Sequence, residues 1–482
     1  MQVSHKSPDS DVLRVTAHGA SVFLLLVVII LLGMNSIGLV RASIPPSTRP
    51  EPASIVLGQA NFNSTGSANG PAGLSEPEFV AFDHSGNLWV SDYNNSLVAE
   101  YSPPFTTGEH ASLEVGSESF STSGCSGTGA EDICNPHGIA FDPSGNLWVA
   151  DSGNSSVVEF SAPFTTGEKS SIVIGEYSDG QPNATNLDEP YGIAFDSAGN
   201  LWVADSNDNR IVEYMAPLAS GEAASLVIGQ ASLTSAGDNN AQANMSSPED
   251  IAFDKSGNLW VADTQNSRVL EFTLPFSNGE KASEVIGAPN FSSFNGNDTQ
   301  SAVTLPEALA FDHSGDLWVA DSGNSRVLEF PTPTMTGENA NILIGQYSYF
   351  YGGPNATQYQ LGYPEGIGFD SNGNLWVADP GYSRVLEYSN PLTYTPTATT
   401  STSTTATTTM TTTTATVTSS SSSPATTNSV TSGTLTSTTS NSGGVPAFPY
   451  QFTIAASFTI ALAAAYMLVR RRVGLAGRMR SP

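Results

Sequence analysis

Short apolar runs separated by polar turns recur along the middle of the chain. Residues 192–196 read Gly-Ile-Ala-Phe-Asp, residues 200–205 read Asn-Leu-Trp-Val-Ala-Asp, and Ser-Ala-Gly lies between them. Two such runs joined by a tight polar turn predict a β-hairpin. Residues 210–214 alternate apolar and polar side chains, and residues 225–229 form a fourth short apolar run. The unit is therefore predicted to contain four short antiparallel strands.

This unit occurs six times in succession. Each copy contains the phrase Leu-Trp-Val, and the copies follow one another at intervals of 54 to 59 residues. The tryptophans of these phrases are Trp89, Trp148, Trp202, Trp260, Trp318 and Trp376. A fixed period of this size indicates a repeat architecture, in which each unit buries one face on its neighbours. Because four short antiparallel strands are typical of a propeller blade, the sequence predicts an all-β fold, a six-bladed β-propeller.

The two ends of the repeat array complement each other. The fourth-strand phrase is missing after the sixth tryptophan, but Ser-Ile-Val-Leu-Gly at residues 54–58 supplies it ahead of the first unit. An N-terminal strand that completes the last blade would close the ring and remove its open edges. We therefore expect one propeller domain over residues 53–390, closed by an N-terminal strand.

The N-terminal segment is predicted to lie outside this domain. Lys6 and Arg14 precede an apolar run over residues 20–32. This order is typical of a secretory signal peptide, which we place at residues 1–42, with an uncleaved membrane anchor as the alternative. Residues 43–52 are then a linker to the propeller.

The C-terminal segment predicts a tether. Residues 391–449 consist mostly of Thr and Ser and contain no charged residue, which indicates a disordered stalk. Residues 450–469 are uncharged and largely apolar, and the arginines of residues 470–482 follow them. This pattern predicts a transmembrane helix with a basic cytoplasmic tail, which places the propeller at the cell surface. Residues 445–449 resemble the Pro-Glu-Phe sorting tails of some bacterial and archaeal surface proteins, with Ala447 in place of Glu; the resemblance implies removal of the helix.

Charge and cysteine content narrow the partner classes. The chain has 16 Lys and Arg against 45 Asp and Glu, a net charge of −29, which excludes nucleic acid as a partner. An acidic domain attracts cations, cationic peptides or metal ions, although adaptation to a salt-rich habitat gives the same composition. Two cysteines exclude a cysteine-rich scaffold or a four-cysteine zinc site. In an exported protein, Cys125 and Cys134 are predicted to form a disulfide.

Glycosylation is a further expectation for an exported chain. Eight Asn-x-Ser/Thr sequons occur in the sequence and predict a glycoprotein in a host that modifies them. Their asparagines are Asn63, Asn94, Asn154, Asn183, Asn244, Asn290, Asn297 and Asn355. All of them belong to predicted loops and turns.

The repeated phrases resemble the NHL repeat, whose pattern runs Pro-x-Gly-Ile-Ala-x-Asp, Gly-x-Leu-x-Val-Ala-Asp and Asn-x-Arg-Val. Residues 136–142 read Pro-His-Gly-Ile-Ala-Phe-Asp, residues 145–151 read Gly-Asn-Leu-Trp-Val-Ala-Asp, and residues 266–269 read Asn-Ser-Arg-Val. Leu97 and Ser156 replace the Arg in the first two units. The resemblance implies a six-bladed propeller that binds proteins, peptides or glycans on its top face, with a minority of members being enzymes.

A ligand site is predicted where the repeats differ. Long loops of variable sequence precede each first strand, and the residue that follows the proline near the end of each loop is not the same in all six units. These residues are Glu78, His137, Tyr191, Glu249, Glu307 and Glu365. Because six-fold symmetry would gather them around the central axis, we expect them to bind a ligand or cation. The alternative is that they are solvent-exposed residues at the start of each first strand without a role in binding.

Two classes of function fit these observations. A zinc lyase site of the kind found in some NHL-like propellers needs several histidines, and only His137 lies near the predicted ring. A lactonase-type calcium site that includes Glu307 and Glu365 needs only oxygen ligands and stays open. We therefore expect no catalytic residues, no bound metal and no cofactor, with calcium as the exception to test. The favoured function is a cell-surface recognition or adhesion module for extracellular protein, peptide or glycan, and the alternative is a metal-dependent extracellular lactonase- or lyase-like enzyme.

Overall fold

The computed structural model describes the central part of the chain. The residues described are 51–391, apart from 118, 121–124, 126–131, 177–181, 294–295, 334 and 350–353. The predicted signal peptide, the transmembrane helix at 450–469 and all of the stalk except residue 391 fall outside them. Within the described part, no helix is long and apolar enough to cross a membrane.

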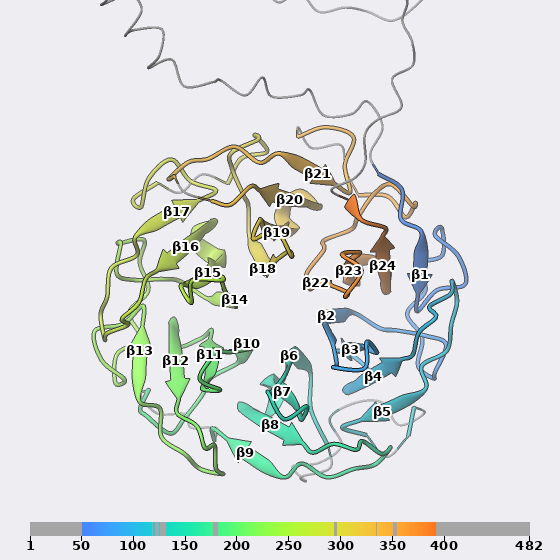
Figure 1. The fold of residues 1–482 in the computed structure, drawn as a ribbon, viewed down its shortest axis with the longest axis horizontal. Coiled ribbons are helices and arrows are strands. Elements are labelled where there is room, and N and C mark those ends of the chain that lie inside the picture. The colour runs from blue at the N-terminus through green and yellow to red at the C-terminus, as the bar shows by residue number, and fades with distance from the viewer. Residues whose placement is uncertain are drawn as a thin grey trace, which may run out of the picture. The chain divides into compact units, whose positions relative to one another are not determined.

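Six four-stranded antiparallel sheets surround a central axis, and we number these blades in chain order (Figure 1). Blade 1 contains β2 (Pro77–Phe82), β3 (Leu88–Asp92), β4 (Leu97–Tyr101) and β5 (Leu113–Val115). Blade 2 contains β6 (Pro136–Phe141), β7 (Leu147–Asp151), β8 (Ser156–Phe160) and β9 (Ile172–Ile174). Blade 3 contains β10 (Pro190–Phe195), β11 (Leu201–Asp205), β12 (Arg210–Tyr214) and β13 (Leu226–Ile228).

The remaining blades repeat this order from the axis outward. Blade 4 contains β14 (Pro248–Phe253), β15 (Leu259–Asp263), β16 (Arg268–Phe272) and β17 (Glu284–Ile286). Blade 5 contains β18 (Pro306–Phe311), β19 (Leu317–Asp321), β20 (Arg326–Phe330) and β21 (Ile342–Ile344). Blade 6 contains β22 (Ile367–Phe369), β23 (Leu375–Asp379), β24 (Arg384–Tyr388) and β1 (Ile55–Leu57). Short 3₁₀ turns follow four of the second strands: η1 (Ser152–Asn154), η2 (Thr264–Asn266), η3 (Ser322–Asn324) and η4 (Pro380–Tyr382).

Blade 6 combines strands from the two ends of the propeller. β1 lies beside β24 and runs antiparallel to it, with Ile55 opposite Glu387 and Leu57 opposite Val385 (Figure 1). The Ser54 amide adds a hydrogen bond of 2.7 Å to the carbonyl oxygen of Glu387. Because β1 supplies the outer strand of blade 6, it covers the outer edge of β24, and the last blade is completed by the start of the propeller.

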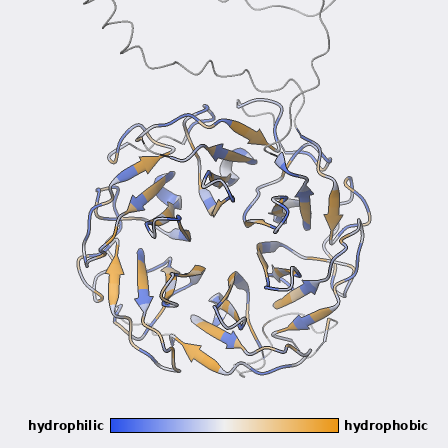
Figure 2. Ribbon diagram, viewed as in Figure 1, coloured by the Kyte–Doolittle hydropathy of each residue, from blue (hydrophilic) through white to orange (hydrophobic). Residues whose placement is uncertain are grey.

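The core lies between neighbouring blades, where apolar strand residues meet (Figure 2). The tryptophan of each second strand is buried and meets, edge to face, the phenylalanine that ends the first strand of the next blade. These pairs are Trp89–Phe141, Trp148–Phe195, Trp202–Phe253, Trp260–Phe311, Trp318–Phe369 and Trp376–Phe82. Edge-to-face aromatic pairs add stabilisation beyond the apolar area they bury. The once-per-repeat tryptophan is thus the residue that joins each blade to the next.

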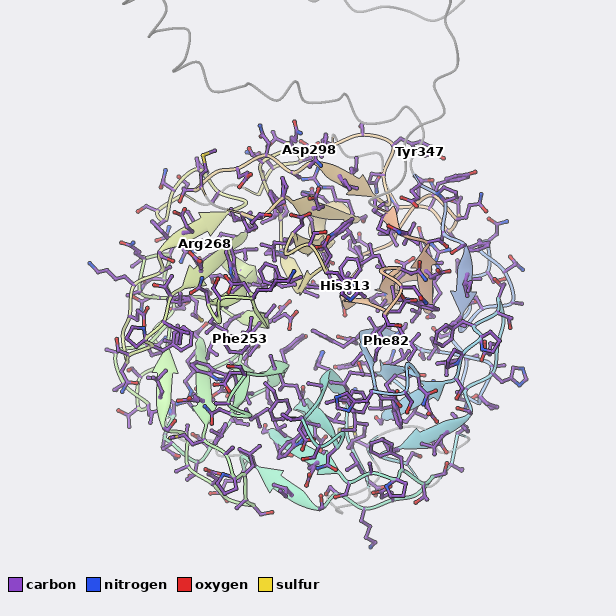
Figure 3. All side chains as sticks on the ribbon, viewed as in Figure 1. Phe82, Phe253, Arg268, Asp298, His313 and Tyr347 are labelled. Carbon is purple, nitrogen blue, oxygen red and sulfur yellow. A yellow bond between two sulfur atoms is a disulfide. The ribbon has the colours of Figure 1, made fainter. Side chains whose placement is uncertain are left out.

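A buried Asp–Arg pair anchors the loops around four of the blades. In blade 4, which contains Arg268 (labelled in Figure 3), the arginine Nε donates to Asp263 Oδ2 at 2.6 Å, and both side chains are fully buried. The guanidinium also donates to the carbonyl oxygens of Asn240, Ala241 and Asn244 in the preceding loop and of Phe291 in the following loop. The equivalent pairs in blades 3, 5 and 6 are Asp205–Arg210, Asp321–Arg326 and Asp379–Arg384. Each arginine therefore acts as a clamp on two loops, as its planar set of donors allows.

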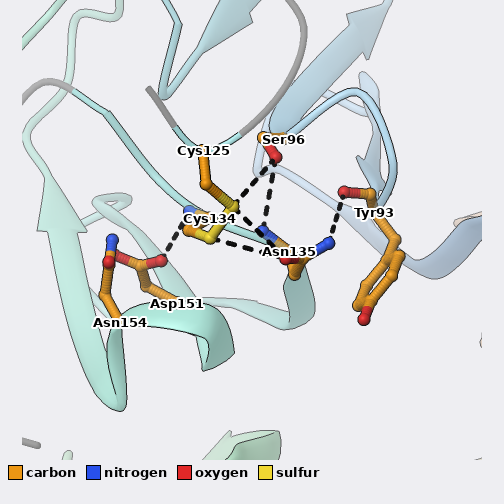
Figure 4. Close-up of a disulfide and its surroundings, with 7 residues drawn as sticks. All are labelled: Tyr93, Ser96, Cys125, Cys134, Asn135, Asp151 and Asn154. Carbon is orange, nitrogen blue, oxygen red and sulfur yellow. Dashed lines mark hydrogen bonds between the residues drawn. A yellow bond between two sulfur atoms is a disulfide. The ribbon is translucent and has the colours of Figure 1, made fainter. Parts of the chain in front are cut away.

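The loop between blades 1 and 2 has neither of the two arginines that would clamp it. Leu97 and Ser156 occupy those positions. Instead, Cys125 and Cys134 form a disulfide in this loop, and the Cys134 amide donates to Asp151 Oδ1 at 2.6 Å (Figure 4). The covalent bond thus restrains the one connection that has lost the polar clamp on both sides.

Loss of this disulfide is expected to destabilise the propeller measurably. We expect Cys125→Ser to lower the free energy of unfolding by about 2–3 kcal/mol, because the unfolded chain regains the entropy of the closed loop. Urea denaturation followed by tryptophan fluorescence measures the change. Reducing agent should shift the wild-type curve by the same amount and leave the variant unchanged. Identical curves for oxidised and reduced wild-type protein would show that other contacts hold this loop.

Candidate functional site

The six residues predicted to form a ring lie at equivalent positions in the six blades. Five directly follow the proline that begins an innermost strand, and Glu365 keeps the same register because its amide donates to the Ala378 carbonyl at 3.1 Å. Innermost strands of neighbouring blades contact one another around the axis, and side chains reach toward it (Figure 3). We call the set the axial ring: Glu78, His137, Tyr191, Glu249, Glu307 and Glu365.

The axial ring lies near the face that carries the long interblade loops, because each innermost strand starts at that face. Glu78 and His137 are buried, with 7% and 4% of their surface exposed, and the other four members are half-buried. Glu78 and His137 therefore do not fit the alternative in which all six are solvent-exposed residues at the start of each first strand. The ring thus combines an interior part with a part that reaches solvent.

One side of the axial ring is aromatic. The His137 ring stacks on the Tyr191 ring, with centroids 3.6 Å apart and planes at 27°. Tyr93, which directly follows β3 and is half-buried, also contacts His137, with 4.9 Å between ring centroids. Tyr93 was not predicted from the sequence, because the equivalent position in four other blades carries a hydroxyl residue.

The hydroxyl residues at the Tyr93 position are Ser152, Ser206, Thr264 and Ser322. Three of them donate to the carbonyl oxygen of the proline that begins the next blade, and Thr264 does so to Pro306 at 2.7 Å. A signal was present in the sequence, since the residue after each strand-terminal Asp is small and polar except for Tyr93 and Pro380. In blade 1, Tyr93 takes the place of this small polar residue and puts an aromatic ring beside His137.

The other side of the axial ring is an arc of four carboxyls on consecutive blades. The pKa of Glu78 is raised to about 8, mainly by burial and also by the nearby carboxyls of Glu249 and Glu76, while a hydrogen bond with Glu365 lowers it. Burial also raises the pKa values of Glu249, Glu307 and Glu365 well above the ordinary range, and each is raised again by another member of the arc. Like charges this close disfavour simultaneous ionisation, so the arc retains protons at neutral pH.

Glu78 links the carboxyl arc to the aromatic side. His137 Nδ1 lies 2.6 Å from Glu78 Oε2, a hydrogen bond that holds one proton. Burial lowers the pKa of His137 to about 3, whereas it raises the pKa of Glu78 to about 8. Glu78 is therefore the group that carries the shared proton at neutral pH and donates it to the imidazole.

Glu307 has an incomplete set of hydrogen bonds. Glu365 and Ser322 both hydrogen-bond to its carboxyl, the first raising its pKa and the second lowering it, yet Oε2 of the same carboxyl is buried and has no hydrogen-bond partner among the described residues. A buried polar oxygen without a partner is costly in free energy. The arrangement leaves an acceptor available to a donor group of a ligand.

Asp250 is a second residue that sequence reasoning missed. It stands where blades 2, 3 and 6 have a glycine, and its buried Oδ2 accepts the Leu309 amide of blade 5 at 2.8 Å. A side chain on Gly192 would lie within 2.4 Å of Asp250 Oδ1, so that glycine provides the space for the carboxyl. Burial raises the pKa of Asp250 to about 7. Its negative charge, where present, raises the pKa of Glu249 in turn.

The described residues contain no group of three or more His, Cys, Asp or Glu side chains arranged to hold a metal ion. The axial carboxyls instead interact with one another and with hydroxyl groups. A calcium ion held by Glu307 and Glu365 stays a prediction to be tested by metal analysis.

Comparison with known proteins places the repeats in a defined class. The NHL repeat model matches residues 134–160, 187–214, 245–272 and 304–330, which are the first three strands of blades 2 to 5. The chain therefore contains NHL repeats within a six-bladed β-propeller, as the resemblance of the repeated phrases predicted.

Individual relatives are distant. Mouse Teneurin-1 is 23% identical over 392 residues, which span 71% of this chain but only 14% of Teneurin-1. Among solved structures, a streptogramin B lyase is 16% identical with a TM-score of 0.40 and covers 68% of this chain and 98% of its own. A gluconolactonase from Xanthomonas campestris is 15% identical with a TM-score of 0.43 and covers 72% of this chain and 99% of its own.

Proposed function

We propose that the protein is a cell-surface recognition module that binds an extracellular protein, peptide or glycan through its axial ring. The predicted signal peptide, Ser/Thr-rich stalk and C-terminal helix would export the propeller and tether it outside the plasma membrane. The loop face is the part of the molecule in which the blades differ most in sequence. Variable loops on a rigid scaffold are where binding residues concentrate.

The observation that carries this proposal is the unequal occupation of six equivalent positions. A purely structural role would favour the same residue in every blade, as at the six buried tryptophans and the six strand-terminal aspartates. The axial positions instead hold four carboxyls, an imidazole and a phenol, at a cost in burial that the blades do not need for packing. Groups retained at such a cost are typical of a binding site.

Intact cells that display the full-length chain test this function and its location together. Cells are incubated with fluorescent peptide and glycan collections, before and after protease is added outside. We expect at least one ligand to bind, to be lost after protease, and to be lost from the Glu249→Gln/Glu307→Gln double variant. The matched control is Glu168→Gln, in the turn between β8 and β9 on the opposite face, which should bind as wild type. Binding that survives the double variant would place the site elsewhere.

A further inference from the structure

The axial ring is acidic without a balancing positive charge in the described part of the chain. The interactions that shift the four carboxyl pKa values come from other carboxyls and from the hydroxyls of Thr264 and Ser322. The arginines that could neutralise them are engaged in the buried pairs with strand-terminal aspartates. Two exposed carboxyls, Glu76 and Glu189, contribute to the same field, since both raise the pKa of Tyr93.

The carboxyl arc and the aromatic side together complete the ring. Blades 4, 5, 6 and 1 supply Glu249, Glu307, Glu365 and Glu78, whereas blades 2 and 3 supply the stacked His137 and Tyr191. An aromatic face attracts a cation through its quadrupole, and a carboxylate attracts it through its charge. The two sides of the ring thus favour the same kind of ligand.

The hydrogen-bonding groups of the axial ring further limit the chemistry of the ligand. Oε2 of Glu307 is a buried acceptor without a donor, and none of the axial carboxyls has a lysine or arginine partner among the interactions described. An ammonium group carries three donors and no acceptor, which suits a site whose free groups accept hydrogen bonds. It also places its charge on one compact nitrogen that fits beside several oxygens.

We infer that the axial ring binds the protonated primary amine of a ligand, with its nitrogen held by the carboxyl arc and the stem that carries it against Tyr93. This inference rests on the proposed function and names the chemistry of its ligand. A lysine side chain of a partner protein and a free small amine are the two sources of such a group.

Binding of an ammonium group is coupled to proton release. A cation beside the arc favours the ionised carboxyls, so protons held by groups of raised pKa are released when the ligand binds. Affinity should therefore increase as the pH rises from about 6 to about 8, the pKa of Glu78 in the ligand-free protein. The titratable groups that face the ligand are Glu78, Glu249, Glu307, Glu365, Asp250, His137, Tyr93, Tyr191, Glu76 and Glu189.

Isothermal titration calorimetry on the purified full-length chain tests the inference. The probes are the blocked tripeptide Gly-Lys-Gly, the same peptide acetylated on its lysine, and n-butylamine, each titrated in two buffers of different ionisation enthalpy at pH 6 and pH 8. We expect the lysyl peptide to bind more tightly at pH 8 and to release protons, and the acetylated peptide not to bind. Equal affinity for butylamine identifies a free amine as the ligand, and weaker affinity identifies a protein lysine.

Two variants separate recognition from folding. Glu307→Gln should weaken binding of the lysyl peptide at least tenfold, and Tyr93→Ala, at a half-exposed ring, about three- to tenfold with an unchanged melting temperature. Glu168→Gln should bind as wild type. Absence of binding by both amines, or equal binding of the acetylated peptide, overturns the inference. The proposed function still holds after that result if a ligand without an amine binds cells that display the wild-type chain but not cells that display the Glu249→Gln/Glu307→Gln variant. If binding of no ligand depends on these two residues, the proposed function fails together with the inference.

Discussion

The propeller is expected to melt at a lower temperature at pH 8 than at pH 5, by on the order of 5 °C or more. The unfolded Glu78 has an ordinary pKa of 4.5, whereas burial raises the pKa in the folded protein to about 8. Between these values the folded state holds a proton that the unfolded state has released, so stability falls as pH rises. The contribution of Glu78 is fully present below pH 4.5 and is lost as the pH passes about 8, a change on the order of a few kcal/mol.

Other buried carboxyls act in the same direction. Burial raises the pKa of Asp250 to about 7, and the pKa values of Glu249, Glu307 and Glu365 also rise. Paired surface carboxylates usually show the opposite dependence, in which acid destabilises the protein. A melting temperature that increases with pH would therefore show that the axial carboxyls are ionised and solvated in the folded protein.

A single amide substitution separates the axial carboxyls from the rest of the domain. Glu365 interacts with both Glu78 and Glu307, so Glu365→Gln removes one of the two inner members of the arc. We expect the variant to melt at a higher temperature than wild type at pH 8 and to show a shallower dependence on pH. Glu168→Gln on the opposite face is the matched control and should follow the wild-type curve. Calorimetric scans at pH 5, 6.5 and 8 provide the comparison.

The fold could be predicted in detail because the same phrase is repeated six times. The third strand was expected at Arg210–Tyr214 and is observed there as β12. The first strand was expected at residues 192–196 but begins at Pro190, because Pro190 pairs with Asp205 across an irregularity that separates it from Ile193. A proline after a polar loop gives no periodic signal, so this extension depends on the hairpin partner and was not visible in the alternation of side chains.

The axial site was accessible to sequence reasoning only as a set of positions. The proline register indicates which residues share a level around the axis, but not how deeply each is buried or which neighbour it contacts. The hydrogen bond of Glu78 with His137 joins residues 59 positions apart in different blades. Tyr93 and Asp250 were missed for the same reason, since each acts on a neighbouring blade. Protonation in the arc follows from these cross-blade contacts rather than from any local pattern.

Removal of one arginine clamp is expected to have the largest effect on stability. Arg268→Leu should lower the free energy of unfolding by about 3–5 kcal/mol, because Asp263 stays buried while its charged partner is lost. Four loop carbonyl oxygens lose their donor at the same time, those of Asn240, Ala241, Asn244 and Phe291. Urea denaturation midpoints and slopes, compared with wild type, measure the loss.

Blade 1 provides the natural control for this substitution. It carries Leu97 in place of the arginine, and there Asn95 Nδ2 donates to Asp92 Oδ2 at 2.8 Å and to the Ala68 carbonyl at 3.0 Å. Asn266 contacts Asp263 in a similar way at 3.0 Å, so it can satisfy the carboxylate but not the four loop carbonyls that Arg268 contacts. Adding Asp263→Asn to Arg268→Leu should therefore recover only the part of the loss that comes from the buried charge. If Arg268→Leu alone lowers the free energy of unfolding by less than about 1 kcal/mol, Asn266 is sufficient to replace the arginine clamp, as Asn95 does in blade 1.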